Sequence, residues 1–154
     1  MKTLIVCQSV HHGNTRKIAE VMAKELKAKL VSPSELTTGF AKGFDLIGFG
    51  SGVYVGKFHK QMINLVEQMV KVNGARAFVF STSGMGETKT FNIFNKDFSE
   101  RLNRKGFEVL GCFNCPGWDT FSIFRFIGGL NKRRPNKNDL QRAAKFANEM
   151  KSLC

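Results

Sequence analysis

Short apolar runs alternate with longer segments of helical periodicity along the chain. Four runs are almost wholly apolar, which is typical of strands buried on both faces of a sheet; they cover residues 3–7, 45–50, 76–81 and 107–113. A weaker strand is expected at residues 29–32. The chain therefore predicts five short strands.

The segments between these runs repeat apolar residues every three or four positions, the spacing of one face of a helix. Four apolar stripes have this spacing: Ile18, Val21, Met22 and Leu26; Met62, Leu65, Val66 and Met69; Phe94, Phe98 and Leu102; and Leu140, Ala143, Ala144, Ala147 and Met150. Gly106 is expected in the C-cap position of the third helix. Asn136 and Asp139, after Pro135, are expected to form a capping box at the start of the fourth.

Strands that alternate with helices predict an α/β fold with a doubly wound, five-stranded parallel sheet, because right-handed helical crossovers join parallel neighbours. The 154 residues suit a single domain, 1–154, which can fold without a disulfide or a metal. Such sheets bind ligands at the carboxyl ends of their strands, near the point where the strand order reverses. The loops after the first, third, fourth and fifth strands are therefore the places to look for chemistry.

The loop after the first strand has the composition of a phosphate site. It consists of Ser9, Val10, His11, His12, Gly13, Asn14 and Thr15 and leads directly into the first helix. Backbone N–H groups around the glycine can converge on an anion, and the helix N-terminus adds a partial charge of about +0.5. The alternative is a plain turn with Asn14 or Thr15 as the N-cap. The loop lacks the Gly-Lys-Ser/Thr of a P-loop and the three glycines of a dinucleotide site.

Two further loops are rich in glycine and small polar residues. The loop after the third strand begins with Ser51, Gly52, Val53 and Tyr54, and the loop after the fourth contains Ser81, Thr82, Ser83, Gly84, Met85 and Gly86. Facing a phosphate loop across the end of the sheet, these two loops would form a slot for a flat ring.

Together the three loops resemble those of the flavodoxin family. The motif Ser-x-x-x-Gly-Asn-Thr, from Ser9 to Thr15, is similar to the FMN-phosphate loop of that family with one additional residue. Residues 51–54 are similar to the loop that covers the isoalloxazine, and residues 81–88 to the second loop that contacts the ring. The resemblance extends over the whole chain and includes Phe-x-Cys-x-Gly-x-Asp-Thr at 113–120.

The resemblance implies noncovalently bound FMN, the strand order 2-1-3-4-5, and transfer of one or two electrons. It implies phosphate and ribityl contacts from Ser9, His11, Gly13, Asn14 and Thr15, and ring contacts from Ser51, Gly52, Val53, Tyr54, Ser83, Gly84 and Met85. Val10, His12, Ser81, Thr82 and Gly86 complete the expected cofactor-binding set. The two histidines are expected either to serve the flavin or to be ordinary loop residues, and not to bind a metal, because no third ligand has matching spacing.

Charge and aromatic placement set the chain apart from typical flavodoxins. Those proteins are commonly acidic, whereas 24 basic and 12 acidic residues give this chain a net charge of +12. Many flavodoxins place a tryptophan on one flavin face and a tyrosine on the other. Here Tyr54 is well placed, whereas Trp118, after the fifth strand, is expected to pack elsewhere.

The long segment 114–136 combines aromatic and basic residues, ending in Lys132, Arg133 and Arg134. Loops of this length are uncommon in compact domains unless they have a function or contain a small helix. Three interpretations remain open: a docking patch, a contact with a membrane surface, or a flap that covers the sheet edge, which we favour. Half of the net charge lies between residues 125 and 151.

The four cysteines, at positions 7, 112, 115 and 154, are too few and too unevenly spaced for a secreted disulfide framework. Cys112 and Cys115 form a C-x-x-C, but a redox pair usually opens a helix, and Cys112 lies in a predicted strand. Cys7 lacks the arginine that a phosphatase nucleophile would need in the following loop. No apolar run approaches the ~20 residues of a membrane span, so we expect a cytoplasmic protein without stable membrane insertion.

The leading functional hypothesis is a low-potential FMN electron carrier that docks an acidic redox partner of the ferredoxin or flavodoxin reductase type. The enzymatic alternative is a small FMN oxidoreductase acting on a quinone, because residues 50–59 distantly resemble quinone-dependent protoporphyrinogen dehydrogenases of this fold. A non-redox module that binds nucleic acid is disfavoured, since no aromatic RNA-reading motif occurs. The acid residues of phosphoacceptor signalling domains are missing as well. A monomer or weak dimer is expected.

Overall fold

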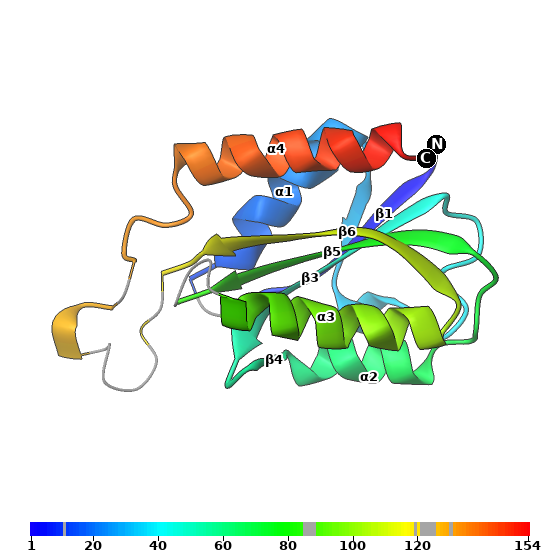
Figure 1. Ribbon diagram of the computed structural model, residues 1–154, viewed down its shortest axis with the longest axis horizontal. Coiled ribbons are helices and arrows are strands. Elements are labelled where there is room, and N and C mark those ends of the chain that lie inside the picture. The colour runs from blue at the N-terminus through cyan, green and yellow to red at the C-terminus, as the bar shows by residue number, and fades with distance from the viewer. Residues whose placement is uncertain (11, 85–88, 119, 121–125, 130) are drawn as a thin grey trace.

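A parallel sheet lies between two layers of helices (Figure 1). The computed structural model describes residues 1–10, 12–84, 89–118, 120, 126–129 and 131–154, with the backbone alone at 89–92. The central strands are β1 (Thr3–Gln8), β2 (Lys29–Val31), β3 (Leu46–Tyr54), β5 (Ala75–Ser83) and β6 (Phe107–Pro116). Their order is β2-β1-β3-β5-β6 and all these pairings are parallel, which confirms the predicted five-stranded sheet and its order.

The structure differs from the sequence prediction at the carboxyl ends of the strands. β3, β5 and β6 continue for four, two and three residues past their predicted ends. The apolar pattern stops there, but the parallel ladder goes on through polar pairs such as Ser51 with Ser81 and Gly52 with Thr82. A two-residue strand, β4 (Lys57–Phe58), pairs antiparallel with the end of β3 and is too short to show a periodic pattern.

Four α-helices occupy the predicted positions: α1 (Asn14–Leu26), α2 (Lys60–Gln68), α3 (Lys89–Arg104) and α4 (Lys137–Ser152), with a short 3₁₀ turn, η1, at Pro33–Glu35. The predicted capping box at the start of α4 is confirmed: Asp139 N–H donates to Asn136 Oδ1 (3.1 Å), and Asn136 N–H donates to Asp139 Oδ2 (2.8 Å). Gly106 follows α3 with a positive φ of 92°, as its C-cap position requires. In the described part of the chain, no helix has the length and apolarity to cross a membrane.

Each face of the sheet packs against its own pair of helices. Phe49, Met62 and Phe98 lie in the cluster beneath α2 and α3, whereas Ile5, Phe78, Phe80, Met22 and Ala147 lie in the cluster beneath α1 and α4. Two glycines of β3 make the second cluster possible. A Cβ at Gly48 would lie 2.3 Å from the Phe78 ring, and one at Gly50 would lie 2.0 Å from the Phe80 ring.

All parallel strands end at the same edge of the sheet, the left side in Figure 1, and the two chain termini lie at the opposite edge. Four connections therefore meet at the carboxyl edge: those that follow β1, β3, β5 and β6. This is the edge at which a doubly wound sheet binds its ligands.

Candidate cofactor-binding site

A pocket opens at the carboxyl edge of the sheet. Its described lining residues come from all four connections: Asn14, Thr15, Gly52, Val53, Tyr54, Val55, Thr82, Ser83, Gly84 and Trp118. Three loops that are far apart in the sequence thus contribute to one cavity, as their resemblance to flavodoxin loops implied. Among these ten residues, only Val55 and Trp118 lie outside the cofactor-binding set expected from the sequence.

Several other predicted residues adjoin the pocket without lining it. Val10 N–H donates to the Tyr54 hydroxyl (3.4 Å). Ser51 lies beneath the pocket, where its hydroxyl donates to the Gly52 carbonyl (2.7 Å) and accepts from His59 N–H (2.9 Å). These bonds hold the loop after β3 in place.

Ser81 occupies the corresponding position at the end of β5. Its hydroxyl donates to Asn95 Oδ1 of α3 (2.9 Å) and accepts from Asn114 Nδ2 of β6 (2.8 Å). The predicted residues His11, Met85 and Gly86 lie outside the described residues, whereas Ser9 is described and is half-buried.

The start of α1 has the geometry of an anion site. Gly13 is the N-cap, in the left-handed region with φ 65°, and no side chain among the described residues caps the helix. Asn14 and Thr15 are not the N-cap, as the alternative interpretation of this loop had expected, because both residues lie within the helix and are buried. The first N–H groups of a helix have no intrahelical acceptor, so these groups are available to an anion.

Two buried polar atoms at the pocket have no hydrogen-bond partner among the described residues: Asn14 Oδ1 and Ser83 Oγ. Buried polar atoms of native proteins are nearly always paired, and an unpaired one costs about 1–3 kcal/mol. The remaining polar groups of the lining are engaged, since the Thr15 and Thr82 hydroxyls lie 2.8 Å apart and Asn14 Nδ2 donates to the Trp118 carbonyl (2.7 Å). The lining therefore has hydrogen-bonding capacity that a polar ligand would satisfy.

Trp118 lines the pocket, and the expectation that it packs elsewhere is wrong. Its ring stacks on His12 with centroids 3.8 Å apart and an angle of 24° between the planes. Its indole N–H donates to the Gly128 carbonyl (3.2 Å), and His12 Nε2 lies 2.8 Å from Thr120 Oγ1. The described lining of the pocket thus includes two large aromatic residues, Trp118 and Tyr54.

The end of β6 explains how Trp118 reaches the pocket. Residues 113, 115 and 117 are buried and alternate with half-buried neighbours, which is the period of a strand that continues past the predicted end at 113. Gly117 then lies against α1, where a Cβ would come within 2.8 Å of Asn14 Nδ2. Trp118, which follows Gly117, therefore lies next to the start of α1.

A sequence profile described as "Flavodoxin domain" matches residues 4–118. The chain belongs to the flavodoxin family. It is 44% identical over 147 residues to the uncharacterised protein MJ0298 of Methanocaldococcus jannaschii, and the match covers 96% of each chain.

Solved structures agree on the fold. The chain is similar to oxidised flavodoxin 2 from Bacillus cereus, with a TM-score of 0.76 and 18% identity over the whole of both chains. It is also similar to a flavoprotein from Lactobacillus acidophilus solved in complex with FMN. That comparison gives a TM-score of 0.59 and 23% identity and covers 74% of this chain and 93% of that one.

The cysteines of this flavodoxin-family protein do not form a reactive pair. All four lie in the described part of the chain and none is in a disulfide. Cys112 contacts Ser99 of α3, whereas Cys115 lies in the core beneath α1 and α4, so the two thiols are on opposite faces of the sheet. Burial raises the pKa of the Cys7 thiol to about 12 and also raises the pKa of Cys112. The buried Cys7 thiol is therefore protonated at neutral pH and unsuited to nucleophilic attack.

The three consecutive bases of the flavodoxin-family chain differ in their environment. Lys132 and Arg133 are exposed, whereas Arg134 is half-buried and donates two hydrogen bonds to Asp139, from Nε to Oδ2 (2.5 Å) and from Nη2 to Oδ1 (2.6 Å). Among the described residues, no three His, Cys, Asp or Glu side chains come together as metal ligands.

Proposed function

We propose that this protein binds one FMN noncovalently in the pocket and acts as a cytoplasmic, low-potential electron carrier. The observation that supports this most is the pocket itself: an uncapped helix start, two unpaired buried polar atoms and two aromatic residues converge on it. The family membership and the FMN complex of the Lactobacillus relative favour the same ligand. When bound, FMN supplies the one- or two-electron redox chemistry.

The residues of the pocket fit the chemically different parts of FMN. The backbone N–H groups at the start of α1, next to Gly13, suit the phosphate. Asn14 Oδ1 can accept a hydrogen bond from the polar ribityl chain or ring edge, and Ser83 Oγ can donate or accept one. Tyr54 and Trp118 line the pocket and are aromatic, so they suit the isoalloxazine ring; His12 already covers one face of Trp118, which leaves the other for the flavin. Among the described lining residues none has a permanent charge, so the phosphate would be bound by backbone groups.

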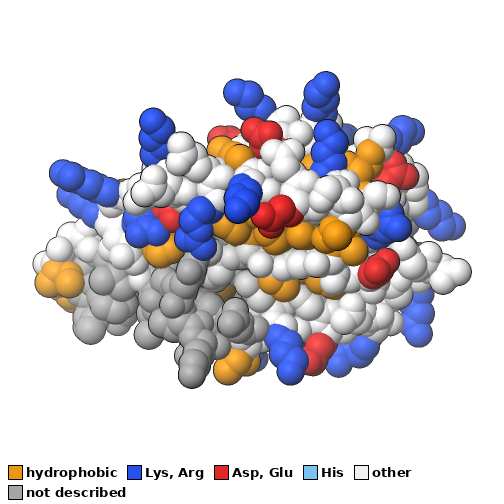
Figure 2. Space-filling view, turned by 45° about the horizontal axis from the view of Figure 1, so that its top comes forward, with side chains coloured by type: hydrophobic (Ala, Val, Ile, Leu, Met, Phe, Trp, Pro, Cys, Tyr) orange, Lys and Arg blue, Asp and Glu red, His pale blue; other side chains and the backbone are white. Residues whose placement is uncertain are grey.

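An acidic redox protein is the proposed partner. Basic side chains are spread over the face that α4 covers, and acidic ones are fewer there (Figure 2). The chain segments 8–20, 51–60 and 126–139 contain eight bases and two acids, Glu20 and Asp139, which are paired with Arg16 and Arg134. A positive rim around the cofactor would attract a negatively charged protein and repel a positive one.

Direct reduction of a quinone is the second candidate function. It is favoured by the hairpin of β3 and β4, in which Tyr54 pairs with Lys57 within the segment 50–59 that distantly resembles quinone-dependent enzymes. A small neutral acceptor could reach a bound flavin without protein docking.

Titration with flavins tests the proposal. The protein freed of any flavin should bind FMN at one per chain and bind it more tightly than riboflavin, since each hydrogen bond to a charged group contributes about 1.5–3 kcal/mol. Flavin fluorescence and calorimetry would measure both affinities. Absence of binding of FMN, FAD and riboflavin would refute the proposed function.

A further inference from the structure

The segment between β6 and α4, residues 117–136, is joined to the pocket at its start. Gly117 N–H donates to the Ser83 carbonyl (2.9 Å), and the Trp118 carbonyl accepts from Asn14 Nδ2 (2.7 Å). Ser83 and Asn14 both line the pocket. The first residues of the segment therefore extend the pocket wall.

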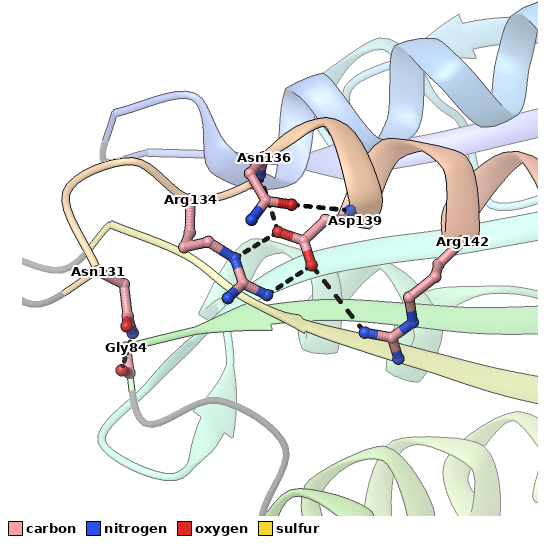
Figure 3. A network of polar contacts seen from close by, with 6 residues as sticks. All are labelled: Gly84, Asn131, Arg134, Asn136, Asp139 and Arg142. Atoms are coloured by element: carbon pink, nitrogen blue, oxygen red, sulfur yellow. Dashed lines mark hydrogen bonds and ion pairs between the residues drawn. The ribbon is translucent and has the colours of Figure 1, made fainter.

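The end of the segment returns to the same place. Asn131 Nδ2 donates to the carbonyl of Gly84, another lining residue (2.5 Å; Figure 3). Three residues later, the Arg134 carbonyl accepts from Trp118 N–H (3.2 Å). The backbone of Trp118 is thus bonded through its N–H to the end of its own segment and through its carbonyl to α1.

An ion pair anchors Arg134 in turn. Its guanidinium binds both oxygens of Asp139, and Asp139 is fully buried in the first turn of α4, where the capping box with Asn136 fixes it (Figure 3). Arg142, from the next turn of α4, approaches the same carboxylate at 4.0 Å. Two arginines therefore contact Asp139, but only Arg134 belongs to the segment that holds Trp118.

We propose that Arg134 and Asp139 are positioning residues of the pocket. Their ion pair fixes the Arg134 carbonyl to α4, and that carbonyl holds Trp118 in the wall against which a planar aromatic ligand stacks. A bidentate guanidinium–carboxylate pair is stronger and more directional than a neutral backbone hydrogen bond, so the ion pair holds Arg134 firmly at the start of α4. The inference rests on the proposed function in one respect only, namely that the ligand at this wall is FMN.

Trp118 is the only tryptophan of the chain, so its fluorescence reports on this wall directly. The test compares Arg134→Gln with the matched control Arg142→Gln, which also removes an arginine from Asp139. In protein freed of flavin, Arg134→Gln should at least double the acrylamide quenching constant of Trp118, whereas Arg142→Gln should leave it unchanged. FMN should dissociate about tenfold faster from Arg134→Gln and at the wild-type rate from Arg142→Gln.

A double variant tests whether Arg134 acts through Trp118. In a Trp118→Ala background, Arg134→Gln should add little to the FMN dissociation rate, because the group that it positions is gone. An equal acceleration in both backgrounds would overturn the proposal, as would equal effects of the two arginine variants or an unchanged quenching constant in Arg134→Gln. Circular dichroism and urea midpoints would show whether the variants fold.

If Arg134→Gln fails to fold, Asp139→Asn replaces it, since its amide oxygen can still accept from Asn136 N–H while the ion pair is lost. If the wild type binds no flavin at all, the proposed function fails. The quenching constants of the variants without flavin then still support or overturn the positioning of Trp118 by Arg134.

Discussion

At the scale of single residues, Gly13 has a strict conformational requirement. It caps α1 with φ 65°, a region that β-branched residues rarely adopt, although no atom lies within 4 Å of a Cβ built there. Gly13→Val should distort the N–H groups of the helix start and weaken FMN binding by tenfold or more. Riboflavin, which has no phosphate, should be affected far less. Equilibrium titration of both ligands measures the difference.

Gly43→Val is the matched control for this substitution. Gly43 has φ 91°, is exposed and likewise has no atom within 4 Å of a Cβ, but it lies outside the pocket. It should lower stability without changing the preference for FMN over riboflavin. Equal losses of both ligands in Gly13→Val would show that the helix start is not the phosphate site.

The two aromatic residues of the pocket should behave differently from Gly13. Both ligands contain the isoalloxazine ring, so Tyr54→Ala and Trp118→Ala should weaken FMN and riboflavin alike. Aromatic stacking adds ~0.5–1.5 kcal/mol beyond area burial, which corresponds to a loss of about two- to twelvefold. The same titrations, with the midpoint potentials of bound FMN, measure the effect. A Trp118→Ala variant with wild-type affinity would show that the ring does not stack on this wall.

At the scale of elements, the start of α4 should make stability depend on pH. Burial alone would raise the pKa of Asp139, but the hydrogen bonds from Arg134 and Asn136 N–H outweigh it and lower the pKa. A lowered folded-state pKa means that the unfolded chain takes up its proton first as the pH falls. The ionised Asp139 carboxylate therefore contributes its full share to the free energy of unfolding at pH values above about 3.9, the ordinary pKa of an aspartate. This contribution is lost as the pH falls through the pKa of Asp139 in the folded protein.

Asp139→Asn should thus lower the free energy of unfolding at pH 7 by about 1–3 kcal/mol. The difference from the wild type should shrink once the pH falls below about 4. Urea unfolding at pH 7, 5, 4 and 3 measures it. A difference that stays constant over this range would contradict the assigned role of the carboxylate.

At the scale of the whole molecule, the net charge of +12 should govern the encounter with a protein partner. Electrostatic steering raises association rates by about 10–10³-fold and is screened beyond ~8 Å at physiological ionic strength. Electron transfer to an acidic ferredoxin or reductase should therefore slow steeply as salt rises. Reduction of a neutral quinone should respond little. Stopped-flow rates measured for each acceptor across a salt series distinguish the electron-carrier function from direct quinone reduction.

Charge-reversal variants locate the steering surface. Lys132→Glu with Arg133→Glu should slow the protein reaction and leave FMN affinity unchanged, and Arg134 is spared because it is paired with Asp139. Lys2→Glu with Lys71→Glu changes the charge equally at the opposite edge of the sheet and should slow the reaction less. If the protein reduces quinone rapidly and independently of salt but transfers electrons to a partner protein only slowly, the quinone oxidoreductase hypothesis would be favoured.

The sequence by itself determined the order of elements and the three loops that meet at the pocket. These features depend on local patterns: apolar runs, helical stripes such as Phe98 with Leu102, and the capping box at Asn136 are all visible within a few residues. The strand order and the family followed from the resemblance of the loops. Periodicity could not show where β3, β5 and β6 end, since polar residues continue the ladder by backbone bonds alone.

Only the tertiary structure decided the pocket wall and the environment of Arg134. The Asn14–Trp118 and His12–Thr120 contacts join residues 104 and 108 positions apart, and no local pattern encodes such a pairing. The Arg134–Asp139 pair is different, because the two residues are only five positions apart; the start of α4 brings them together and distinguishes Arg134 from its two exposed neighbours. A side chain's chemistry is local, but its partner depends on how distant segments pack, and here that packing places the only tryptophan at the pocket.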